Sequence, residues 1–219
     1  MRAIVTTGPT REYLDPVRYI SNESSGKQGY EIALALKKLG IKTKLIAGPS
    51  NFFSSKDLKI KNIISAKDMM NEVKKSLPVD IAVCAAAVSD FRPIVKSKNK
   101  IKKKDNTLYK LSLEKNPDIL DYLSKNNNAR PKIVVGFSAE TENVIYNSKL
   151  KIKDKYCDLI IANDVSKKDT GFNSDYNKIS IIDKKGNVKS IPKNKKSFIA
   201  GTIARIILDK LLINDKNIN

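Results

Sequence analysis

The feature that most constrains the fold is a series of short apolar runs rich in β-branched residues, separated by longer polar or amphipathic segments. The runs occupy residues 3–6, 43–46, 60–64, 81–84, 133–136 and 159–161. Runs of this length are typical of strands buried on both faces, and strands that alternate with helices form parallel βαβ units. The sequence therefore predicts an α/β fold with a doubly wound, mostly parallel sheet.

Amphipathic helices are predicted between these runs. In residues 29–39, Ile32, Leu36 and Leu39 fall near one helix face, and Gly40 follows as a typical C-terminal stop. Further helices are predicted over residues 143–155 and 195–212, and another is predicted to open at Ser65.

Two hairpins are predicted outside the alternating pattern. Residues 178–192 contain two strand-like runs around a turn at residues 183–187, and residues 98–114 form a second candidate with its turn at residues 105–106. A two-stranded ribbon is marginal alone in water and gains stability by packing on another sheet. We therefore expect one domain over residues 1–219 whose hairpin insertions are used for dimerisation.

Composition excludes several classes of protein. No apolar run approaches the roughly 18 residues of a membrane span, and no signal peptide precedes the first run, so we expect a soluble, cytoplasmic protein without membrane contact. Cys84 and Cys157 lie in apolar stretches without CxxC or His partners, which predicts buried free thiols. Because the sequence contains no histidine, Ser-His-Asp catalysis, Cys-His catalysis and His metal sites are excluded.

The net charge of +19 raises the alternative of a nucleic-acid-binding domain. Only six of the 42 basic residues are Arg, and lysines are abundant along the whole chain. Arg is the preferred residue for bidentate phosphate contacts and base readout, so a Lys-rich surface is poor support for specific recognition. We expect no nucleic acid partner, and steeply salt-dependent retention of nucleic acid would be the contrary observation.

The loops that follow the strands hold the candidate site. Open sheets of this class bind ligands outside the carboxyl ends of their strands, which directs attention to residues 7–26, 85–93 and 137–141. In the first loop, Ser24, Ser25, Gly26 and Lys27 bring hydroxyls, backbone N–H groups and an ammonium to a helix start, a good phosphate cradle. An ordinary Ser N-cap is the alternative, but loops longer than about a dozen residues are usually functional.

Three other segments have a structural and a functional interpretation. Small residues at 85–87 would let a flat ligand approach the backbone, and Asp90 offers a carboxylate to a ribose, a base amine or a metal-nucleotide, or simply forms an Asx-turn. The lysines of residues 98–104 are either a solvated run or a binding element. Asn116 is expected to cap a helix with Pro117 at its first position.

The motifs follow one another in the order GPTRE, LDPVRYISNxSSGKxG, CAAAVSDFRP, KIKK, KNPDIL, VVGFSAET, DLIIANDVS and GFNSDxN. Together they resemble phosphopantothenoylcysteine synthetase, the second half of the bifunctional coenzyme A biosynthesis flavoprotein of bacteria, and this resemblance implies a Rossmann-like sheet. The match runs from Ala3 to Ile191. Because the chain begins at the synthetase and lacks the preceding flavin-dependent decarboxylase, we expect a free-standing form without flavin.

The resemblance implies a ligase that joins 4'-phosphopantothenate to L-cysteine. A nucleoside triphosphate, CTP in most bacteria and ATP in eukaryotic relatives, activates the substrate carboxylate as an acyl-nucleotide and releases pyrophosphate; the cysteine amine then displaces the nucleotide. We expect CTP and Mg²⁺, although the sequence leaves the choice between CTP and ATP open. The chemistry needs charge neutralisation and an oxyanion stabiliser rather than a nucleophile.

The resemblance also assigns residues. The catalytic pair is Asn22, whose amide can bond the acyl oxygen, and Lys100, suited to the carboxylate and α-phosphate. Arg18 is the candidate for the phosphate of the substrate, with Asn22 beside it, and metal ligands stay unassigned. The nucleotide contacts are expected at Ser24, Ser25, Gly26, Lys27, Ala86, Asp90, Lys100, Pro117, Asp118, Ile119, Leu120, Phe137, Lys151 and Lys155.

Members of the resembled family are dimers with sites near the interface. We accordingly expect a homodimer in which the loop from Arg18 to Asn22 faces the Asp90 loop of the partner, and in which Arg18 and Lys100 reach one site from opposite protomers. An NAD(P)-dependent oxidoreductase is the alternative enzyme, but it would need G-x-G-x-x-G and an acidic residue after the second strand, where residues 47–50 read Ala-Gly-Pro-Ser.

Overall fold

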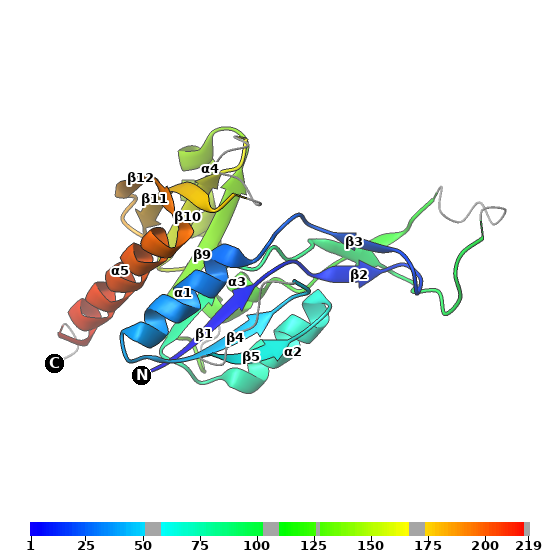
Figure 1. Cartoon of the computed structure of the whole chain (residues 1–219), viewed down its shortest axis with the longest axis horizontal. Coiled ribbons are helices and arrows are strands. Elements are labelled where there is room, and N and C mark those ends of the chain that lie inside the picture. Colours follow the sequence, from blue (N-terminus) through cyan, green and yellow to red (C-terminus); the bar gives the residue numbers. More distant parts are fainter. Residues whose placement is uncertain (51–57, 103–109, 126–127, 167–173, 217–219) are drawn as a thin grey trace.

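The computed structural model describes residues 1–50, 58–102, 110–125, 128–166 and 174–216. Its centre is an eight-stranded sheet with the order β12-β11-β10-β9-β6-β1-β4-β5 (Figure 1). The strands are β1 (Arg2–Thr7), β4 (Lys42–Ala47), β5 (Lys59–Asn62), β6 (Ile81–Cys84), β9 (Ile133–Glu140), β10 (Leu159–Asp164), β11 (Tyr176–Asp183) and β12 (Val188–Lys195). The sheet is parallel from β5 to β10, whereas β11 and β12 are antiparallel.

The parallel part of the sheet has the doubly wound order that the sequence predicts. From β1 the chain moves outward to β4 and β5, then returns to the other side of β1 and continues through β6, β9 and β10. The direction reverses between β1 and β6, where Ala3 lies opposite Ile81 and Thr6 opposite Cys84. Ligands of open α/β sheets bind at such a reversal, so the fold places the site at the carboxyl ends of these two strands.

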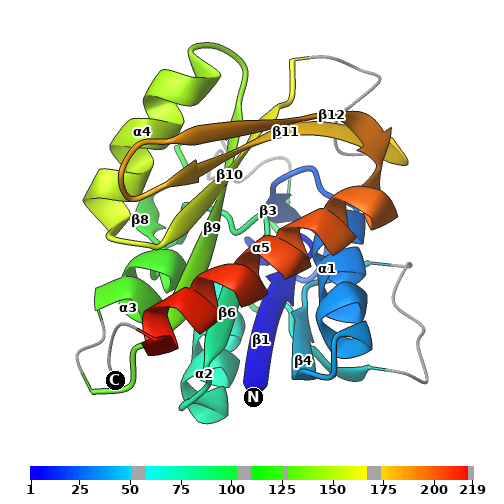
Figure 2. The ribbon, with the colours of Figure 1, turned by 90° about the vertical axis from the view of Figure 1, so that its left-hand side faces the viewer.

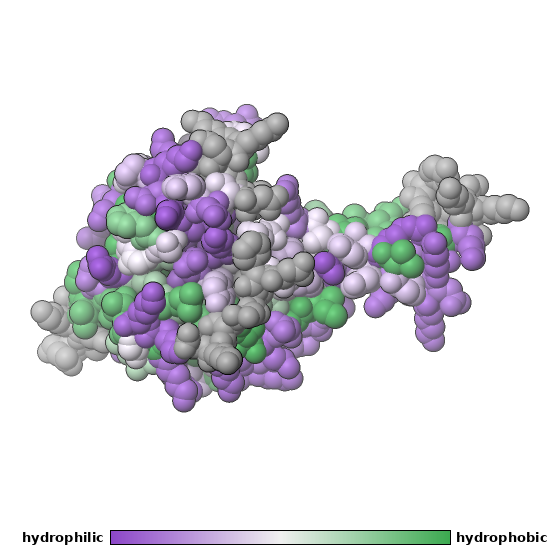
Figure 3. Space-filling model, viewed as in Figure 1, coloured by the Kyte–Doolittle hydropathy of each residue, from purple (hydrophilic) through white to green (hydrophobic). Residues whose placement is uncertain are grey.

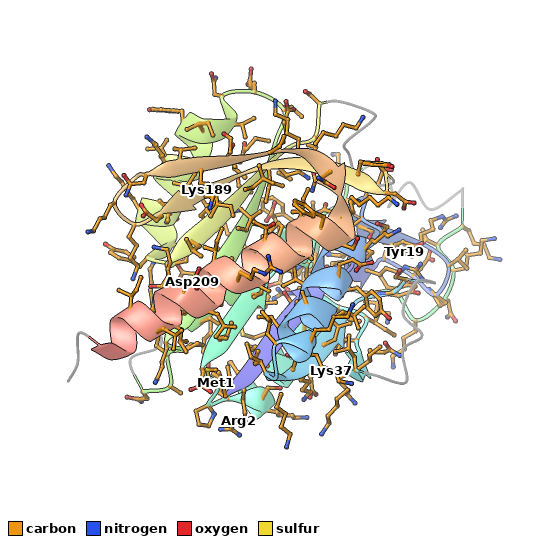
Figure 4. All side chains as sticks on the ribbon, turned by 60° about the vertical axis from the view of Figure 1, so that its left-hand side comes forward. Met1, Arg2, Tyr19, Lys37, Lys189 and Asp209 are labelled. Carbon is orange, nitrogen blue, oxygen red and sulfur yellow. The ribbon has the colours of Figure 1, made fainter. Side chains whose placement is uncertain are left out.

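Helices cover both faces of the sheet, which explains why the strands are apolar on both sides. Helices α1 (Lys27–Lys38) and α5 (Lys196–Lys216) lie side by side on one face (Figure 2), and α2 (Ala66–Ser76), α3 (Ile119–Lys125) and α4 (Val144–Lys155) cover the other. Within β1, Val5 packs with the first pair and Ile4 with the second group. In Figure 4, Lys37 and Asp209 mark α1 and α5.

Several predicted helix ends differ from the structure, since α1 begins at Lys27 instead of residue 29 and α5 runs to Lys216 instead of residue 212. Leu39 is 41% exposed because α1 ends at Lys38, one residue before Leu39 could complete the buried face, and Ala33 is buried instead. Asn116 is not the cap of α3: the helix begins at Ile119, and the Asp118 carboxylate accepts a hydrogen bond from the Asp121 N–H at 2.9 Å. By contrast, a helix follows Ser65 as predicted, and Ser65 caps this helix, α2, through a capping box with Asp68.

The first loop contains structure that the sequence did not predict. Its strands β2 (Arg11–Tyr13) and β3 (Tyr19–Ser21) pair with each other, and β7 (Phe91–Pro93) pairs with β8 (Leu113–Lys115). These two ribbons form an arm, here defined as residues 11–21, 91–102 and 110–115, that projects from one end of the sheet (Figure 1). Residues 98–102 are not a strand. The hairpin expected over residues 98–114 is instead paired between β7 and β8, and its predicted turn at residues 105–106 lies outside the described residues.

The hairpin predicted over residues 178–192 is confirmed as β11 and β12. Its turn holds Gly186 at φ +83°, and the Asp183 side chain accepts hydrogen bonds from the N–H groups of Lys185 and Asn187. However, β11 pairs with β10, so this hairpin extends the main sheet and is not an isolated two-stranded ribbon. This pairing gives no support to the dimerisation role expected for the hairpin.

Candidate active site

Two joined cavities lie at the reversal point of the sheet. The first, of about 550 Å³, is lined by Ser21, Asn22, Glu23, Ser24, Ser25, Gly26, Lys27, Gln28, Gly29, Ala85, Ala86, Ala87, Val88, Asp90, Phe137, Ser138, Ala139, Lys151, Asn163, Asn177 and Lys196. The second, of about 360 Å³, is lined by Thr6, Cys84, Ala86, Val88, Ser89, Asp90, Phe91, Lys115, Asn116, Pro117, Asp118, Ile119, Leu120, Phe137, Lys151 and Lys155. Shared residues such as Asp90, Phe137 and Lys151 make the two cavities one elongated site.

The start of α1 forms one wall of the first cavity. Gly26, with φ +73°, precedes the helix and provides no side-chain cap, which excludes the ordinary Ser N-cap. Instead, the Ser24 hydroxyl accepts from the Gly26 N–H at 3.2 Å and the Ser25 hydroxyl from the Lys27 N–H at 3.4 Å. Helix N-terminal N–H groups and the helix dipole favour anions, so this wall suits a phosphate, and the phosphate contacts expected here stay a prediction.

Close packing fixes this helix start on the sheet. The Thr7 hydroxyl donates to the Gly26 carbonyl at 2.6 Å, and a Cβ at Gly29 would lie only 2.5 Å from Thr7 Oγ1. Gly48, from the loop after β4, approaches Pro9 so closely that a Cβ would lie 1.7 Å from the Pro9 carbonyl oxygen. The glycines therefore let α1 and its loop sit directly against the ends of β1 and β4.

The opposite wall is the segment after β6. The Ala85 N–H donates to the Thr6 carbonyl at 3.1 Å, and the Ala87 N–H donates to the Gly8 carbonyl at 3.0 Å. These hydrogen bonds continue the pairing of β1 and β6 beyond the ends of both strands, and the small alanine side chains line the cavity there. Asn22 reaches this segment, since its side-chain amide donates to the Val88 carbonyl at 2.9 Å. Asn22 and Asp90 of the same chain thus line one cavity, which contradicts the expectation that these loops face each other across a dimer axis.

The second cavity is formed by α3, α4 and the end of β9. The Lys151 ammonium donates to the Phe137 carbonyl at 2.8 Å, while Lys155 pairs with Asp154 at 2.7 Å and with Asp118 at 3.3 Å. The hydrogen bond that the Lys155 ammonium donates to the Asp154 carboxylate, together with the nearby Asp118 carboxylate, raises the pKa of Lys155, so this ammonium is charged at neutral pH. Phe137 is part of β9, which runs to Glu140, and not of a loop as expected.

Both cysteines are free, as predicted. Burial raises the pKa of the Cys84 thiol, which lines the second cavity, and raises the pKa of Cys157 to about 11. A thiolate is the reactive form, so neither cysteine is equipped to act as a nucleophile at neutral pH.

Arg18 and Lys100 lie outside both cavities of their own chain, on the arm. The Arg18 guanidinium donates to the Asp15 carboxylate at 2.7 Å and to the Ile101 carbonyl at 3.2 Å, and Lys100 is exposed. Burial alone would raise the pKa of Asp15, but hydrogen bonds from the N–H groups of Val17, Arg18 and Ile101 outweigh it, and with the Arg18 charge they lower the pKa. Asp15 therefore ties the Arg18 turn to the Lys100 segment.

This contact contradicts one prediction about the dimer. Because Arg18 touches Ile101 of its own chain, Arg18 and Lys100 belong to one arm and cannot reach a common site from opposite protomers. The role of Arg18 as a phosphate ligand stays a prediction.

Several lining residues were not predicted. Ser138, Asn163, Asn177 and Lys196 form the far wall of the first cavity, on β9, β10, β11 and α5. Asn163 Oδ1 is buried and has no hydrogen-bond partner among the described residues. Within the described part of the chain, no group of three or more His, Cys, Asp or Glu side chains could hold a metal ion, and no helix is both long enough and apolar enough to span a bilayer.

Comparison with known proteins agrees with this architecture. The sequence model of one family, DFP, described as the DNA/pantothenate metabolism flavoprotein C-terminal domain, matches residues 1–211. The chain is 41% identical over 204 residues to the coenzyme A biosynthesis bifunctional protein CoaBC of Haemophilus influenzae, covering 93% of this chain and 50% of that protein. The protein of the same name from Escherichia coli K12 is 38% identical over 215 residues, covering 97% and 52%.

The chain thus spans about half the length of the curated relatives it matches. A crystal structure of the C-terminal domain of the coenzyme A biosynthesis bifunctional protein CoaBC superposes with a TM-score of 0.79 at 32% identity, covering 98% of this chain and 96% of that one. This similarity confirms the predicted α/β, Rossmann-like fold.

Proposed function

The chain belongs to the family of DNA/pantothenate metabolism flavoprotein C-terminal domains, and we propose that it is a ligase that joins 4'-phosphopantothenate and L-cysteine. The names of the relatives place them in coenzyme A biosynthesis. The observation that supports the proposal is the elongated site, in which a helix start suited to phosphate, the Asn22 amide and a second cavity of about 360 Å³ are continuous. Cavities of this volume and polarity suit a nucleotide and an acyl group held together.

The proposed reaction has two steps. An oxygen of the phosphopantothenate carboxylate attacks the α-phosphorus of CTP, and the bond to pyrophosphate breaks to leave an acyl-cytidylate. The cysteine amine then attacks the acyl carbon, CMP leaves, and the amine loses a proton as the amide forms. The Asn22 amide faces the acyl oxygen as it gains charge, and Lys100 neutralises the carboxylate and α-phosphate.

The second cavity would hold the nucleoside and the first cavity its phosphates. We propose that Pro117, Asp118, Ile119 and Leu120 surround the base and ribose, together with Ala86 and Phe137, which line the same cavity. Lys151 and Lys155 lie along the path towards Ser24, Ser25, Gly26 and Lys27. We propose CTP as the co-substrate over ATP on the resemblance to the bacterial sequences.

We propose that Mg²⁺ accompanies the nucleotide. The Asp90 carboxylate lines both cavities, and the buried Asn163 amide oxygen faces the first, so hard oxygen donors suited to Mg²⁺ are present beside the phosphate path. When bound, the ion neutralises phosphate charge. We propose no flavin for residues 1–219, because neither step transfers electrons.

We further propose a homodimer in which the arm of one protomer completes the cavity of the other. Lys100 is exposed on an arm that projects away from its own sheet (Figure 1), and the arm presents exposed apolar side chains at Val17, Tyr19, Ile94 and Val95. Apolar patches of this kind commonly mark interaction surfaces. In an isologous dimer each arm would contact the site of the partner.

The other proposals follow from the same chemistry. We place the reaction in the cytoplasm. We expect no nucleic acid partner, because only six of the 42 basic residues are Arg and the lysines are abundant along the whole chain. Hydrophilic residues cover much of the face that is visible in Figure 3. The oxidoreductase alternative gains no support, since the helix start at Gly26 lacks the dinucleotide glycine pattern.

The test is a reconstitution. Purified protein is incubated with phosphopantothenate, cysteine, Mg²⁺ and either CTP or ATP, and both pyrophosphate and the amide product are measured. We expect stoichiometric pyrophosphate and product with CTP. Equal turnover with ATP would refute the nucleotide choice, and no pyrophosphate with either nucleotide would refute the ligase.

A further inference from the structure

The far wall of the first cavity contains a buried lysine that the proposed mechanism does not use. Lys196 is the first residue of α5 and is only 4% exposed, yet it lines the cavity. Its backbone N–H donates to the Asp175 carbonyl at 2.9 Å, and its carbonyl accepts from the Gln28 side chain at 3.3 Å. Gln28 in turn accepts from the Asn177 amide at 3.5 Å, so contacts from α1 and β11 fix the position of Lys196.

Two helices therefore begin at the same cavity, each with a lysine as its first residue. Lys27 opens α1 and Lys196 opens α5, and the two helices lie side by side (Figure 2). The positive ends of two helix dipoles and two ammonium groups thus converge on one space. This arrangement attracts a ligand with several negative charges more strongly than a ligand with one.

The position of Lys196 disfavours the charged form of its side chain. Burial lowers the pKa of Lys196, and the nearby Lys27 lowers it further, while Asp175 acts in the opposite direction. A cation at a helix N-terminus is also disfavoured by the dipole. The Asp175 carboxylate pairs with Lys27 at 2.5 Å, but its side chain is 70% exposed and therefore largely screened by solvent. Ionisable groups kept in such positions within a cleft are typical of functional sites.

We propose that Lys196, together with Lys27, binds the two terminal phosphates of the nucleoside triphosphate and stabilises them as they leave as pyrophosphate. The inference rests on the proposed function and adds a residue to it. The two charges match the pyrophosphate part of the ligand, whereas the phosphate monoester of phosphopantothenate carries less charge. The second cavity, where the nucleoside would lie, joins the first through Asp90, Phe137 and Lys151, which brings the triphosphate into this space.

The experiment compares Lys196→Met with Lys195→Met. Both variants remove one positive charge at adjacent positions, but Lys195 is exposed and does not line the cavity. Isothermal titration calorimetry of the full chain measures the Kd of inorganic pyrophosphate, CTP, CMP and phosphopantothenate. For Lys196→Met we expect Kd values of CTP and pyrophosphate weakened by about 10- to 100-fold, the effect of losing one charged hydrogen-bond donor, and an unchanged Kd of CMP. Lys195→Met is expected to behave as wild type, and Lys196→Arg to recover most of the affinity.

A structural role for Lys196 predicts a different pattern. The melting temperature of Lys196→Met should equal or exceed that of the wild type, because a costly buried charge is removed; a fall in melting temperature with equal weakening of all four ligands would overturn the proposal. Weakened phosphopantothenate with unchanged pyrophosphate would assign the lysine to the substrate phosphate and also overturn it. If wild-type protein binds pyrophosphate through Lys196 but neither CTP nor ATP supports ligation, the proposed function fails while the anion site stands.

Discussion

Mixing two inactive variants tests whether each active site is assembled from two chains. Asn22→Asp alters the cavity: it removes the amide that donates to the Val88 carbonyl at 2.9 Å and places a negative charge where the acyl oxygen gains charge. Lys100→Gln alters only the arm, which projects from the sheet (Figure 1). Loss of one preorganised donor or cation in a site of this kind costs about 10²–10³ in rate, so each parent should retain about 1% of wild-type activity or less.

The expected recovery follows from counting sites. If subunits exchange freely at equal concentrations, about half of the dimers are hybrids, and each hybrid contains one site with an intact cavity and an intact arm. Activity should therefore rise to about one quarter of the wild-type value. Arg18 is unsuitable as the partner of Lys100 in this experiment, because both belong to the same arm and would fail together.

The assay is continuous detection of pyrophosphate after the two variants, carrying different affinity tags, are mixed and exchange is verified by sequential purification of hybrids. Lys98→Gln, which changes another exposed lysine on the same arm, is the matched control and should be active alone. Purified hybrids that stay at the parental rate would refute the two-chain site, as would a molar mass of about 24.4 kDa by light scattering at micromolar concentration.

Three further predictions concern single residues. In a quench assay without cysteine, Lys100→Gln should form little acyl-nucleotide, whereas Asn22→Asp should form it and transfer it slowly; the opposite pattern would reverse their roles. Because its folded-state pKa is lowered, the Asp15 carboxylate contributes stability that is present above its usual pKa of 3.8 and is lost as pH falls through the folded value. Asp15→Asn should therefore lower the melting temperature at pH 7 more than at pH 3, and an equal loss at both would contradict the charge argument. Gly29→Ala should destabilise the chain by about 1–3 kcal/mol in urea unfolding, since its Cβ would lie 2.5 Å from Thr7 Oγ1, whereas Gly201→Ala, with nothing within 4 Å, should not.

The central sheet could be predicted because its signal is local. Strands buried on both faces, such as residues 81–84 and 133–136, must be apolar throughout, so their sequence alone marks them. The start of α1 was predicted to within two residues for the same reason, since the small and hydroxyl residues before Lys27 directly precede the amphipathic pattern.

The arm and the far wall could not be predicted because they depend on contacts between distant residues. Phe91 pairs with Lys115 across a long insertion, and nothing in either three-residue strand marks the register. Lys196 owes its burial to contacts such as that with Gln28, 168 positions earlier, and in a lysine-rich chain it cannot be distinguished by type from its exposed neighbour Lys195. The sequence alone therefore could not show which of the 42 basic residues is buried at the cavity.

Lysines lie on the two outer strands of the sheet, where they can protect the strand edges. β5 reads Lys-Ile-Lys-Asn and β12 reads Val-Lys-Ser-Ile-Pro-Lys-Asn-Lys, and Lys189, marked in Figure 4, is one of the exposed side chains along the latter. Unpaired strand edges are templates for pairing between molecules, and charged side chains and proline are the usual means of blocking them. The lysines of β5 and the lysines and proline of β12 thus protect the two outer edges of the described sheet against fibril-like stacking.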